Sequence, residues 1–292
     1  VVAVSLKKKM RMELTSFSAL LFNPVAQVKF VHTVAAGYVT GAVFVLAISS
    51  WYLLKGRDLG FARRSFAIAS AFGMASILSV IILGDESGYE IGDVQKTKLA
   101  AIEAEWHTEP APAAFTLFGL PNQAEQRTDY AVKIPYVMGI IATRSLDTEV
   151  TGIKDLIKQH EVRIRNGIKA YALLEKLRNG EKTAENLAAF NQHKQDLGYG
   201  LLLKKYTPAV VDASEAQIKQ AALDTIPNVA TVFWSFRLMV ASGFLMLALF
   251  ACAFWASARK NEEKKRWLLK WALYSLPLPW IAAQTGWLVA EH

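Results

Sequence analysis

The sequence has very little cysteine and few charged residues for its length. One cysteine, Cys252, occurs in 292 residues, which excludes a disulfide framework and any metal site built from several cysteines. Charged residues make up 20% of the chain and hydrophobic residues 53%, against about 25% and 45–50% in ordinary soluble domains. The glycine-rich dinucleotide fingerprint, the P-loop, the HExxH motif and the nucleophile elbow are all absent. The enzyme classes that depend on those motifs are therefore excluded.

Long hydrophobic runs distinguish this chain from a soluble protein. A helix that spans a bilayer needs about 20 mostly apolar residues. Four segments meet that requirement: 25–54, 65–83, 229–256 and 267–290. The last contains Pro277 and Pro279, which membrane helices tolerate when neighbouring groups satisfy the freed carbonyls. The alternative for each segment is a buried helix of a soluble protein, but the four together predict an all-α membrane protein with four transmembrane helices.

Positive charge is concentrated beside these hydrophobic segments. Residues 85–224 hold 17 of the 33 Lys and Arg and 20 of the 25 Asp and Glu, so the rest of the chain has 16 basic and 5 acidic residues. Two short loops, 55–64 and 259–266, are rich in Lys and Arg, and such loops stay in the cytoplasm. Lys7–Lys9 oppose this topology weakly, since it places them outside. Because the positive charge flanks membrane segments, it does not indicate nucleic acid as a partner.

The segment between the second and third spans is too long for a passive loop. Apolar residues at helical spacing predict helices over 155–177, 184–197 and 214–223, and no strand alternation stands out. We therefore expect a large, mostly helical extracytoplasmic domain here. The expected division of the chain is a non-native or pre-helix segment 1–24, a transmembrane pair 25–84, the extracytoplasmic domain 85–228 and a second transmembrane pair 229–292.

Two predicted spans carry polar residues that are costly in a membrane. His32 lies in the first span and is followed by small residues, so a bulky group or another helix can approach it. Its two interpretations are a metal or haem ligand or proton relay, and a hydrogen-bonded histidine between helices. Arg237 and Met239 lie at a matching depth in the third span. A buried arginine needs an anionic partner, whereas a methionine in an apolar helix is ordinarily a packing residue.

Further candidates lie at the ends of the spans. Glu291 and Trp287 are near the end of the fourth span, where an interfacial carboxylate and an aromatic-belt residue are the simpler interpretations. The segment 85–105 after the second span is rich in Asp, Glu and Lys, including Lys98 and Glu103. Such a cluster could bind a polar head group and accept protons, although a solvated helix face is the commoner explanation of a charge run.

Several long motifs resemble subunit I of the cytochrome bd ubiquinol oxidases. They are NPVAQVKFVHTVAAGYVTGA, RSFAIASAFGMASILSVIILGDESGYEIGDVQKTKLAAIEAEW, PAPAAFTLFGLP, IPYVMGIIATRS, HEVRIRNGIKAY, DLGYGLLLKKYTP and PLPWIAAQTGWLVAE. The resemblance extends from about residue 10 to 291. It implies an enzyme, a quinol:oxygen oxidoreductase of the respiratory chain that oxidises ubiquinol or menaquinol and releases protons outside.

The resemblance also implies roles for individual residues in the spans. His32 and Met239 match the axial ligands of the low-spin haem b, and Arg237 matches an arginine that supports this haem. Glu291 matches a ligand of the high-spin haem b, and Trp287 matches a tryptophan between the haems.

In the outer segment, the resemblance implies that Lys98 and Glu103 belong to the quinol site. The implied location is the bacterial cytoplasmic membrane, with residues 85–228 on the periplasmic side. The implied partners are membrane lipid, subunit II of the oxidase and small accessory subunits.

The chain departs from the family pattern at both ends. The family's subunit I is longer, and its first helices, with the histidine of the haem d site, have no counterpart here. We therefore expect this chain to hold the quinol-oxidising, haem b-binding part, with the high-spin haem b and haem d complete only in the whole subunit. The alternatives are a haem-free membrane receptor or transporter component with an external binding domain, and a non-functional fragment.

Overall fold

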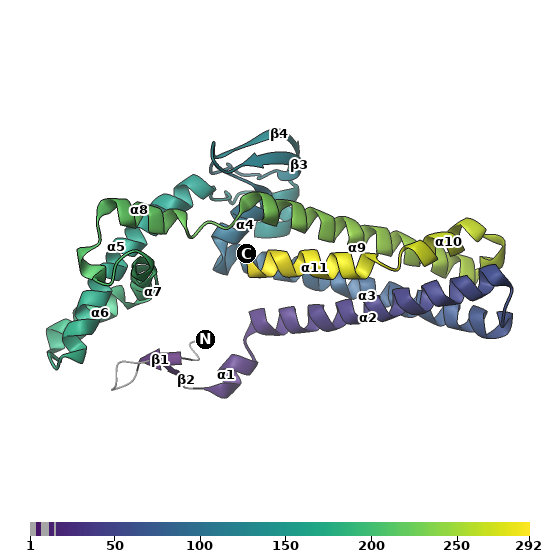
Figure 1. Ribbon diagram of the computed structural model, residues 1–292, viewed down its shortest axis with the longest axis horizontal. Helices are drawn as coiled ribbons and strands as arrows, with labels where there is room; N and C mark the ends of the chain where they lie inside the picture. Colours follow the sequence, from purple (N-terminus) through teal and green to yellow (C-terminus); the bar gives the residue numbers. More distant parts are fainter. Residues whose placement is uncertain (1–3, 7–11, 15) are drawn as a thin grey trace. The chain divides into compact units, whose positions relative to one another are not determined.

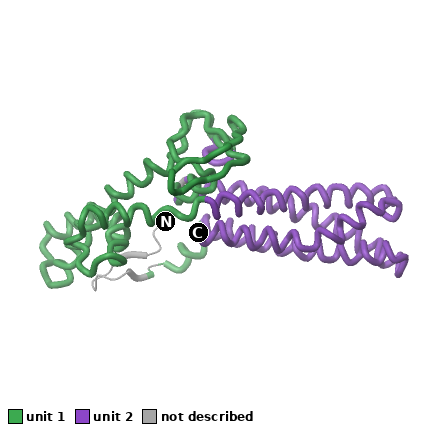
Figure 2. Tube along the Cα trace, turned by 45° about the horizontal axis from the view of Figure 1, so that its top comes forward, with its two compact units in different colours: residues 1–23, 95–140, 145–229 green, residues 24–94, 141–144, 230–292 purple. Residues whose placement is uncertain are grey.

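The computed structural model describes residues 4–6, 12–14 and 16–292, which form two compact units (Figure 2). The bundle unit comprises residues 24–94, 141–144 and 230–292. The loop unit comprises residues 95–140 and 145–229 together with the described part of 1–23. The expected boundaries of the four segments in the sequence stay a prediction.

Antiparallel helices form the bundle unit (Figure 1). They are α2 (Pro24–Lys55), α3 (Leu59–Val94), α9 (Val229–Ala258), α10 (Arg266–Tyr274) and α11 (Leu278–Glu291). Among the described residues, three helices are long and apolar enough to cross a membrane, in α2, in α3 up to Gly92 and in α9. At 1.5 Å per residue, each exceeds the hydrocarbon thickness of about 30 Å. The first three predicted spans therefore correspond to continuous helices, and α3 extends eleven residues past the expected end of its span.

The predicted fourth span is divided. Helices α10 and α11 contain 9 and 14 residues and are separated at Ser275–Pro277. Pro277 and Pro279 have no amide hydrogen, so neither can donate to the carbonyl four residues earlier, and the helix is interrupted there. Each piece is shorter than a span, at about 14 and 21 Å. A continuous fourth span is thus not found in the described chain, and the count of four spans stays a prediction.

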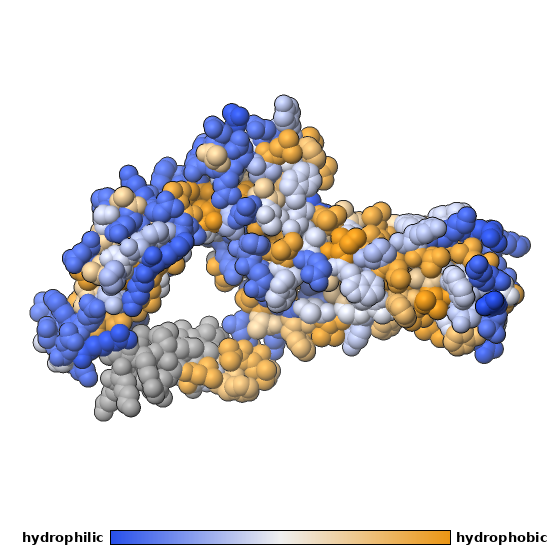
Figure 3. Space-filling view, viewed as in Figure 1, coloured by the Kyte–Doolittle hydropathy of each residue, from blue (hydrophilic) through white to orange (hydrophobic). Residues whose placement is uncertain are grey.

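An apolar core joins the helices of the bundle. Buried residues from α2, α3, α9 and α10 form one cluster, which includes Leu46, Phe66 and Phe250. The closest approach lies between α3 and α9, because a Cβ on Gly73 would be 2.0 Å from Cε1 of Phe250. Apolar side chains also cover the outside of the bundle, and hydrophilic residues gather at the end that carries the α2–α3 and α9–α10 connections (Figure 3).

The two basic connections of the bundle are joined by an ion pair. Arg63 donates from Nε and Nη2 to the two carboxylate oxygens of Glu263, both at 2.6 Å. The connections that were expected on the same side of a membrane are therefore in contact.

Helices and one β-hairpin make up the loop unit. Its helices are α4 (Lys96–Glu103), α5 (Ile153–Arg178), α6 (Ala184–His193), α7 (Leu197–Leu201) and α8 (Glu215–Leu223), with α1 (Phe17–Leu21) nearer the N-terminus. Short 3-10 turns cover Lys194–Asp196, Leu202–Lys205 and Val210–Asp212. The predicted helices over 155–177 and 214–223 are confirmed, and Ser214 with Gln217 forms a capping box at the start of α8. The predicted helix over 184–197 ends earlier, at His193.

The expectation of no strands is wrong. Strands β3 (Phe115–Asn122) and β4 (Arg127–Ile134) form an antiparallel hairpin. Its register shifts twice, between Thr116 and Phe118 and between Phe118 and Leu120. Such irregularities break the two-residue alternation by which a strand is recognised in a sequence. Two shorter strands, β1 (Val4–Leu6) and β2 (Met12–Leu14), also pair, whereas Lys7–Lys9 lie outside the described residues.

Helix α5 is the centre of the loop unit. It packs closely on α7, since a Cβ on Gly167 would lie 2.2 Å from the backbone nitrogen of Gly200. His160 of α5 is buried, and its Nδ1 lies 2.7 Å from Oγ1 of Thr225. Near the end of α8, the Asp224 carboxylate accepts hydrogen bonds from three side chains, those of Lys205, Tyr206 and Gln220.

Candidate functional site

His32 lies on the face of α2 that meets α3. Its Nδ1 is buried and has no hydrogen-bond partner within the described structure. The nearest group on α3 is Gly84, where an added Cβ would lie 3.4 Å from Cε1 of His32. Burial of an imidazole nitrogen without a partner is costly, and such groups in native proteins commonly belong to ligand or catalytic sites. The imidazole also contacts the backbone of Val80 on α3, so both interpretations of His32, a ligand and a histidine hydrogen-bonded between helices, stay predictions.

Met239 on α9 also has a glycine of another helix beside it. A Cβ on Gly286 of α11 would lie 3.0 Å from the Met239 sulfur, which is closer than ordinary van der Waals contact. A glycine thus stands beside each of the two candidate ligands. The absence of a Cβ lets the imidazole and the thioether pack closely on the backbone of these glycines.

His32 and Met239 lie at the same end of the bundle. The starts of α2 and α9 and the end of α11 lie at one end of the bundle in Figure 1. His32 is eight residues after the start of α2 and Met239 ten residues after the start of α9, which corresponds to depths of about 12 and 15 Å. Neutral imidazole and thioether are the donors of a His/Met haem site. The residues present therefore fit an axial pair for haem.

Arg237 lies two residues before Met239 on α9. Its guanidinium donates from Nη1 to the carbonyl of Phe233 at 3.1 Å and lies 3.4 Å from the centroid of the Phe233 ring. These contacts hold a positive charge close to the depth of the two candidate ligands. A bound anionic group at this end of the bundle would therefore meet a fixed cation.

Trp287 and Glu291 lie on the last turns of α11. Trp287 is 62% exposed, and Glu291 is also exposed at the end of the helix. The structure therefore places them at the same end of the bundle as the two candidate ligands, but on the surface of the described chain.

The predicted quinol-site residues lie on the short helix α4 of the loop unit. Glu103 is only 3% exposed and its Oε2 accepts a hydrogen bond of 3.0 Å from the backbone N–H of Thr116 on β3. Lys98 is half-buried, five residues earlier. Five residues correspond to a rotation of about 140° around a helix, so the two side chains leave α4 on different faces.

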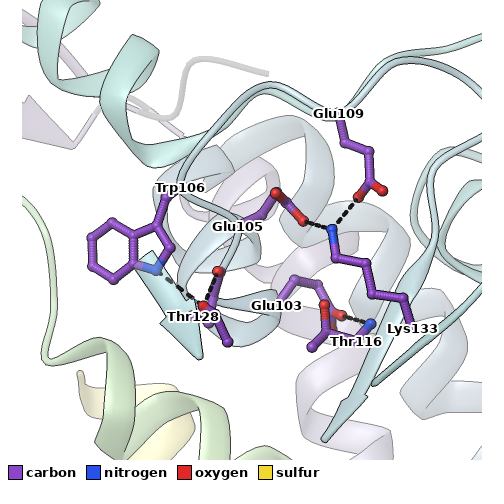
Figure 4. A network of polar contacts seen from close by, with 8 residues as sticks. Glu103, Glu105, Trp106, Glu109, Thr116, Thr128 and Lys133 are labelled. Atoms are coloured by element: carbon purple, nitrogen blue, oxygen red, sulfur yellow. Dashed lines mark hydrogen bonds and ion pairs between the residues drawn. The ribbon is translucent and has the colours of Figure 1, made fainter. Parts of the chain in front are cut away.

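A second group of charges next to Glu103 was not predicted as a cluster (Figure 4). The Lys133 ammonium on β4 donates to Glu105 at 2.7 Å and to Glu109 at 3.2 Å. Burial raises the pKa of Glu105 to about 7, although Lys133 opposes the rise, and the charge of Glu109 adds to it. Burial alone would lower the pKa of Lys133, but its two carboxylate partners raise it.

The main physical reason is burial, because loss of hydration disfavours the charged carboxylate of Glu105. The second carboxylate at the same ammonium adds a smaller rise of the Glu105 pKa. The sequence offers no signal for this arrangement, because Lys133 is far from the two glutamates in the chain and the hairpin brings it to them.

The hairpin is also tied to the end of α4. Trp106 donates from its ring nitrogen to Oγ1 of Thr128 at 3.1 Å, and this hydroxyl donates to the carbonyl of Ala104 at 2.8 Å (Figure 4). Ala104 adopts a left-handed backbone conformation with φ of 50°. The turn after Glu103 is thus held by strand β4.

The segment 141–144 packs against the end of α3 within the bundle unit. Arg144 donates to Glu86 at 2.5 Å and lies 3.6 Å from Asp85 and 4.2 Å from the Tyr89 ring centroid. It follows a π-helical turn, Gly139–Thr143. The contact fixes this segment beside Asp85, the residue after Gly84.

Comparison with known proteins gives a consistent result. The family model described as cytochrome bd terminal oxidase subunit I matches residues 2–292. The chain is 50% identical over 282 residues to "Cytochrome bd-II ubiquinol oxidase subunit 1" of Escherichia coli, covering 97% of this chain and 55% of that protein. It is 27% identical over 284 residues to "Cytochrome bd ubiquinol oxidase subunit 1" of Bacillus subtilis, covering 97% and 49%.

A solved structure shares the fold. The chain matches the bd oxidase of Geobacillus thermodenitrificans with a TM-score of 0.67 and 23% identity, over 100% of this chain and 52% of the other. The chain thus spans about half the length of the relatives that it matches.

Proposed function

Since this chain belongs to the cytochrome bd terminal oxidase subunit I family, we propose that it is the quinol-oxidising, haem-binding part of a bd-type terminal oxidase. The activity is quinol:oxygen oxidoreduction, in which electrons from membrane quinol reduce oxygen and protons are released outside. The name of the E. coli relative, a ubiquinol oxidase subunit, supports this proposal and favours ubiquinol over menaquinol.

The observation that carries the proposal is the buried, unpartnered imidazole nitrogen of His32 beside Gly84. His32 and Met239 would hold the iron of a low-spin haem b, and Arg237 would balance the charge of its propionates. When bound, this haem accepts electrons one at a time, and a His/Met ligand pair raises its reduction potential. Gly84 and Gly286 keep the positions next to both ligands free of side chains.

Quinol binds at Lys98 and Glu103. Oxidation of the quinol releases two electrons and two protons, so the site needs a base. The Glu103 carboxylate is that base, held in place by the Thr116 N–H. Lys98, on another face of α4, stabilises negative charge on the quinol oxygen as the proton leaves.

Trp287 and Glu291 belong to a second haem site. Glu291 would hold the iron of the high-spin haem b, and Trp287 would lie between the two haems. Both side chains are exposed on the described chain, which suits groups that are covered in a larger assembly. That assembly includes the rest of the subunit, which completes the haem d site, and subunit II with small accessory subunits.

The membrane is the bacterial cytoplasmic membrane, and residues 85–228 face the periplasm. The contact between Arg63 and Glu263 supports a common side for the two basic connections, which the positive-inside rule places in the cytoplasm. Protons from the quinol are then released at the opposite side.

A reduced-minus-oxidised visible spectrum of the assembled oxidase tests the haem site. His32→Ala and Met239→Ala should each remove the low-spin haem b band. His193→Ala in the loop unit and Met246→Ala, a buried methionine further along α9, are the matched controls and should keep it. A band that survives both ligand substitutions would show that the haem is held elsewhere.

Quinol oxidation by Lys98→Ala and Glu103→Gln variants tests the quinol site. Both should lose most of the quinol-dependent oxygen consumption while they keep the haem spectrum. Normal consumption by both variants would show that quinol binds at another place.

A further inference from the structure

The question left by the proposed quinol site is where its protons go. Glu103 is 3% exposed, so a proton that it accepts cannot pass directly to bulk water. Oxidation of one quinol releases two protons, so Glu103 must lose the first proton before it can accept another. A buried base needs a second group that connects it to the solvent.

A charged cluster that is more exposed than Glu103 lies next to it (Figure 4). The side chains of Glu105, Glu109 and Lys133 are 14%, 21% and 35% exposed, so exposure increases from Glu103 outward through these residues. The three side chains form one hydrogen-bonded group, with Lys133 in the middle (Figure 4).

One cross-strand pair of the hairpin, Thr116 and Lys133, holds both Glu103 and Glu105. Thr116, whose N–H holds the Glu103 carboxylate, is the cross-strand partner of Lys133, whose ammonium holds Glu105. Cross-strand partners have Cα atoms about 4.5–5.5 Å apart. The two carboxylates are therefore anchored by adjacent residues of β3 and β4, and the bonds of Thr128 and Trp106 hold the turn between them.

We infer that Glu105, with Glu109 and Lys133, is the proton exit of the quinol site. This inference rests on the proposed function. The quinol O–H bond breaks as its proton moves to a Glu103 oxygen, while the electrons of the quinol pass to the electron acceptor of the proposed oxidase activity. The proton then passes through hydrogen-bonded water from Glu103 to a Glu105 oxygen, and from Glu105 past Glu109 to the solvent, which restores the Glu103 carboxylate.

The protonation behaviour of the cluster suits this role. Burial raises the pKa of Glu105 to about 7, so this group both takes up and releases protons near neutral pH. Proton transfer is most efficient when the pKa of the relay lies near the working pH. Glu109 raises this pKa and Lys133 lowers it, and these opposite influences give the inference its test.

The experiment measures kcat and KM for quinol-dependent oxygen consumption across pH in the assembled oxidase. In the parent enzyme, kcat should rise with pH through a step near 7, because Glu105 must be deprotonated to receive a proton. Glu105→Gln should lower kcat about a hundredfold, the low end of general-base effects, and remove the step. KM should change less than twofold, since Glu105 does not touch quinol.

Two further variants separate a relay from a structural role. Glu109→Gln removes a like charge and should move the step to lower pH. Lys133→Met removes the compensating cation and should move the step to higher pH. Glu125→Gln, the same chemical change at an exposed carboxylate near the hairpin turn, should leave the profile unchanged.

The outcomes distinguish this inference from the proposed function. If Glu103→Gln abolishes activity but Glu105→Gln keeps the parent kcat and pH step, the proton exit is wrong and the quinol site stands. If Glu103→Gln is fully active, the quinol site itself is wrong. If Glu105→Gln misfolds and loses its haem spectrum, the Glu109→Gln and Lys133→Met variants test the inference instead. Shifts of the kcat step to the same side of the pH scale in both variants would overturn it.

Discussion

The close approach of α3 and α9 at Gly73 makes a sharp prediction about stability. Replacing Gly73 by Ala would place a Cβ 2.0, 2.4 and 2.5 Å from three ring carbons of Phe250. Carbon atoms in contact are about 3.5–4.0 Å apart, so the ring or the helix has to move by about 1.5 Å. Phe250 is completely buried within the bundle core, so its ring has no free space to enter.

Gly73→Ala should destabilise the protein, because the cost of overpacking exceeds the gain in helix propensity. Overpacking a core costs about 1–3 kcal/mol, and a clash with a buried ring belongs to the upper part of this range. Alanine recovers up to about 1 kcal/mol of helix propensity relative to glycine. A net loss of about 1–2 kcal/mol lowers the unfolding midpoint by about 2–8 °C for a chain of this size.

The assay is thermal denaturation of the detergent-solubilised oxidase at one fixed heating rate. Gly41→Ala is the matched control, since this α2 glycine has nothing within 4 Å of the added Cβ and should not lower the midpoint. Adding Phe250→Leu to Gly73→Ala should recover part of the loss. A Gly73→Ala midpoint equal to that of the parent would refute the packing of α3 on α9.

Three other predictions concern the loop unit and the segment 141–144 of the bundle unit. Gly167→Ala sets a Cβ 2.2 Å from the backbone nitrogen of Gly200, so hydrogen exchange in α5 and α7 should be faster. Arg144→Met removes the ion pair with Glu86, and because exposed pairs contribute about 0–1 kcal/mol, proteolysis near this segment should increase only a few-fold. Hydrogen bonds from the lysine, tyrosine and glutamine that surround Asp224 lower its pKa to about 2 from 3.8. The stabilisation should therefore be present above pH 3.8 and disappear as pH falls towards 2, and a protection difference between the parent and Asp224→Asn that persists at pH 2 would contradict this cause.

The hydrophobic spans could be predicted because their cause is local. About twenty apolar residues in a row have few stable arrangements other than a helix that is removed from water. The segments of α2, α3 and α9 satisfied this condition, and so did the amphipathic pattern of α5. At 267–290 the same reasoning predicted one continuous helix, but hydropathy averages over Pro277 and Pro279, and the backbone cannot continue the hydrogen bonds across them.

The candidate ligands were visible in the sequence as costly residues, but their surroundings were not. His32 and Met239 were named from residue type, depth and family resemblance, and these roles stay predictions. Only packing shows that a glycine on another helix stands beside each of them, because Gly84 and Gly286 are far from their partners in the chain.

The sequence by itself determined the class of the protein, the continuous apolar helices and the residues worth testing, since composition and periodicity act over short distances along the chain. The tertiary structure alone decided that a hairpin brings Lys133 to Glu105 and Glu109, and that Thr116 on the same rung holds Glu103. These contacts depend on strand register and on burial. Burial strengthens electrostatic interactions and moves a carboxyl pKa towards 7, and neither quantity can be read from the order of residues.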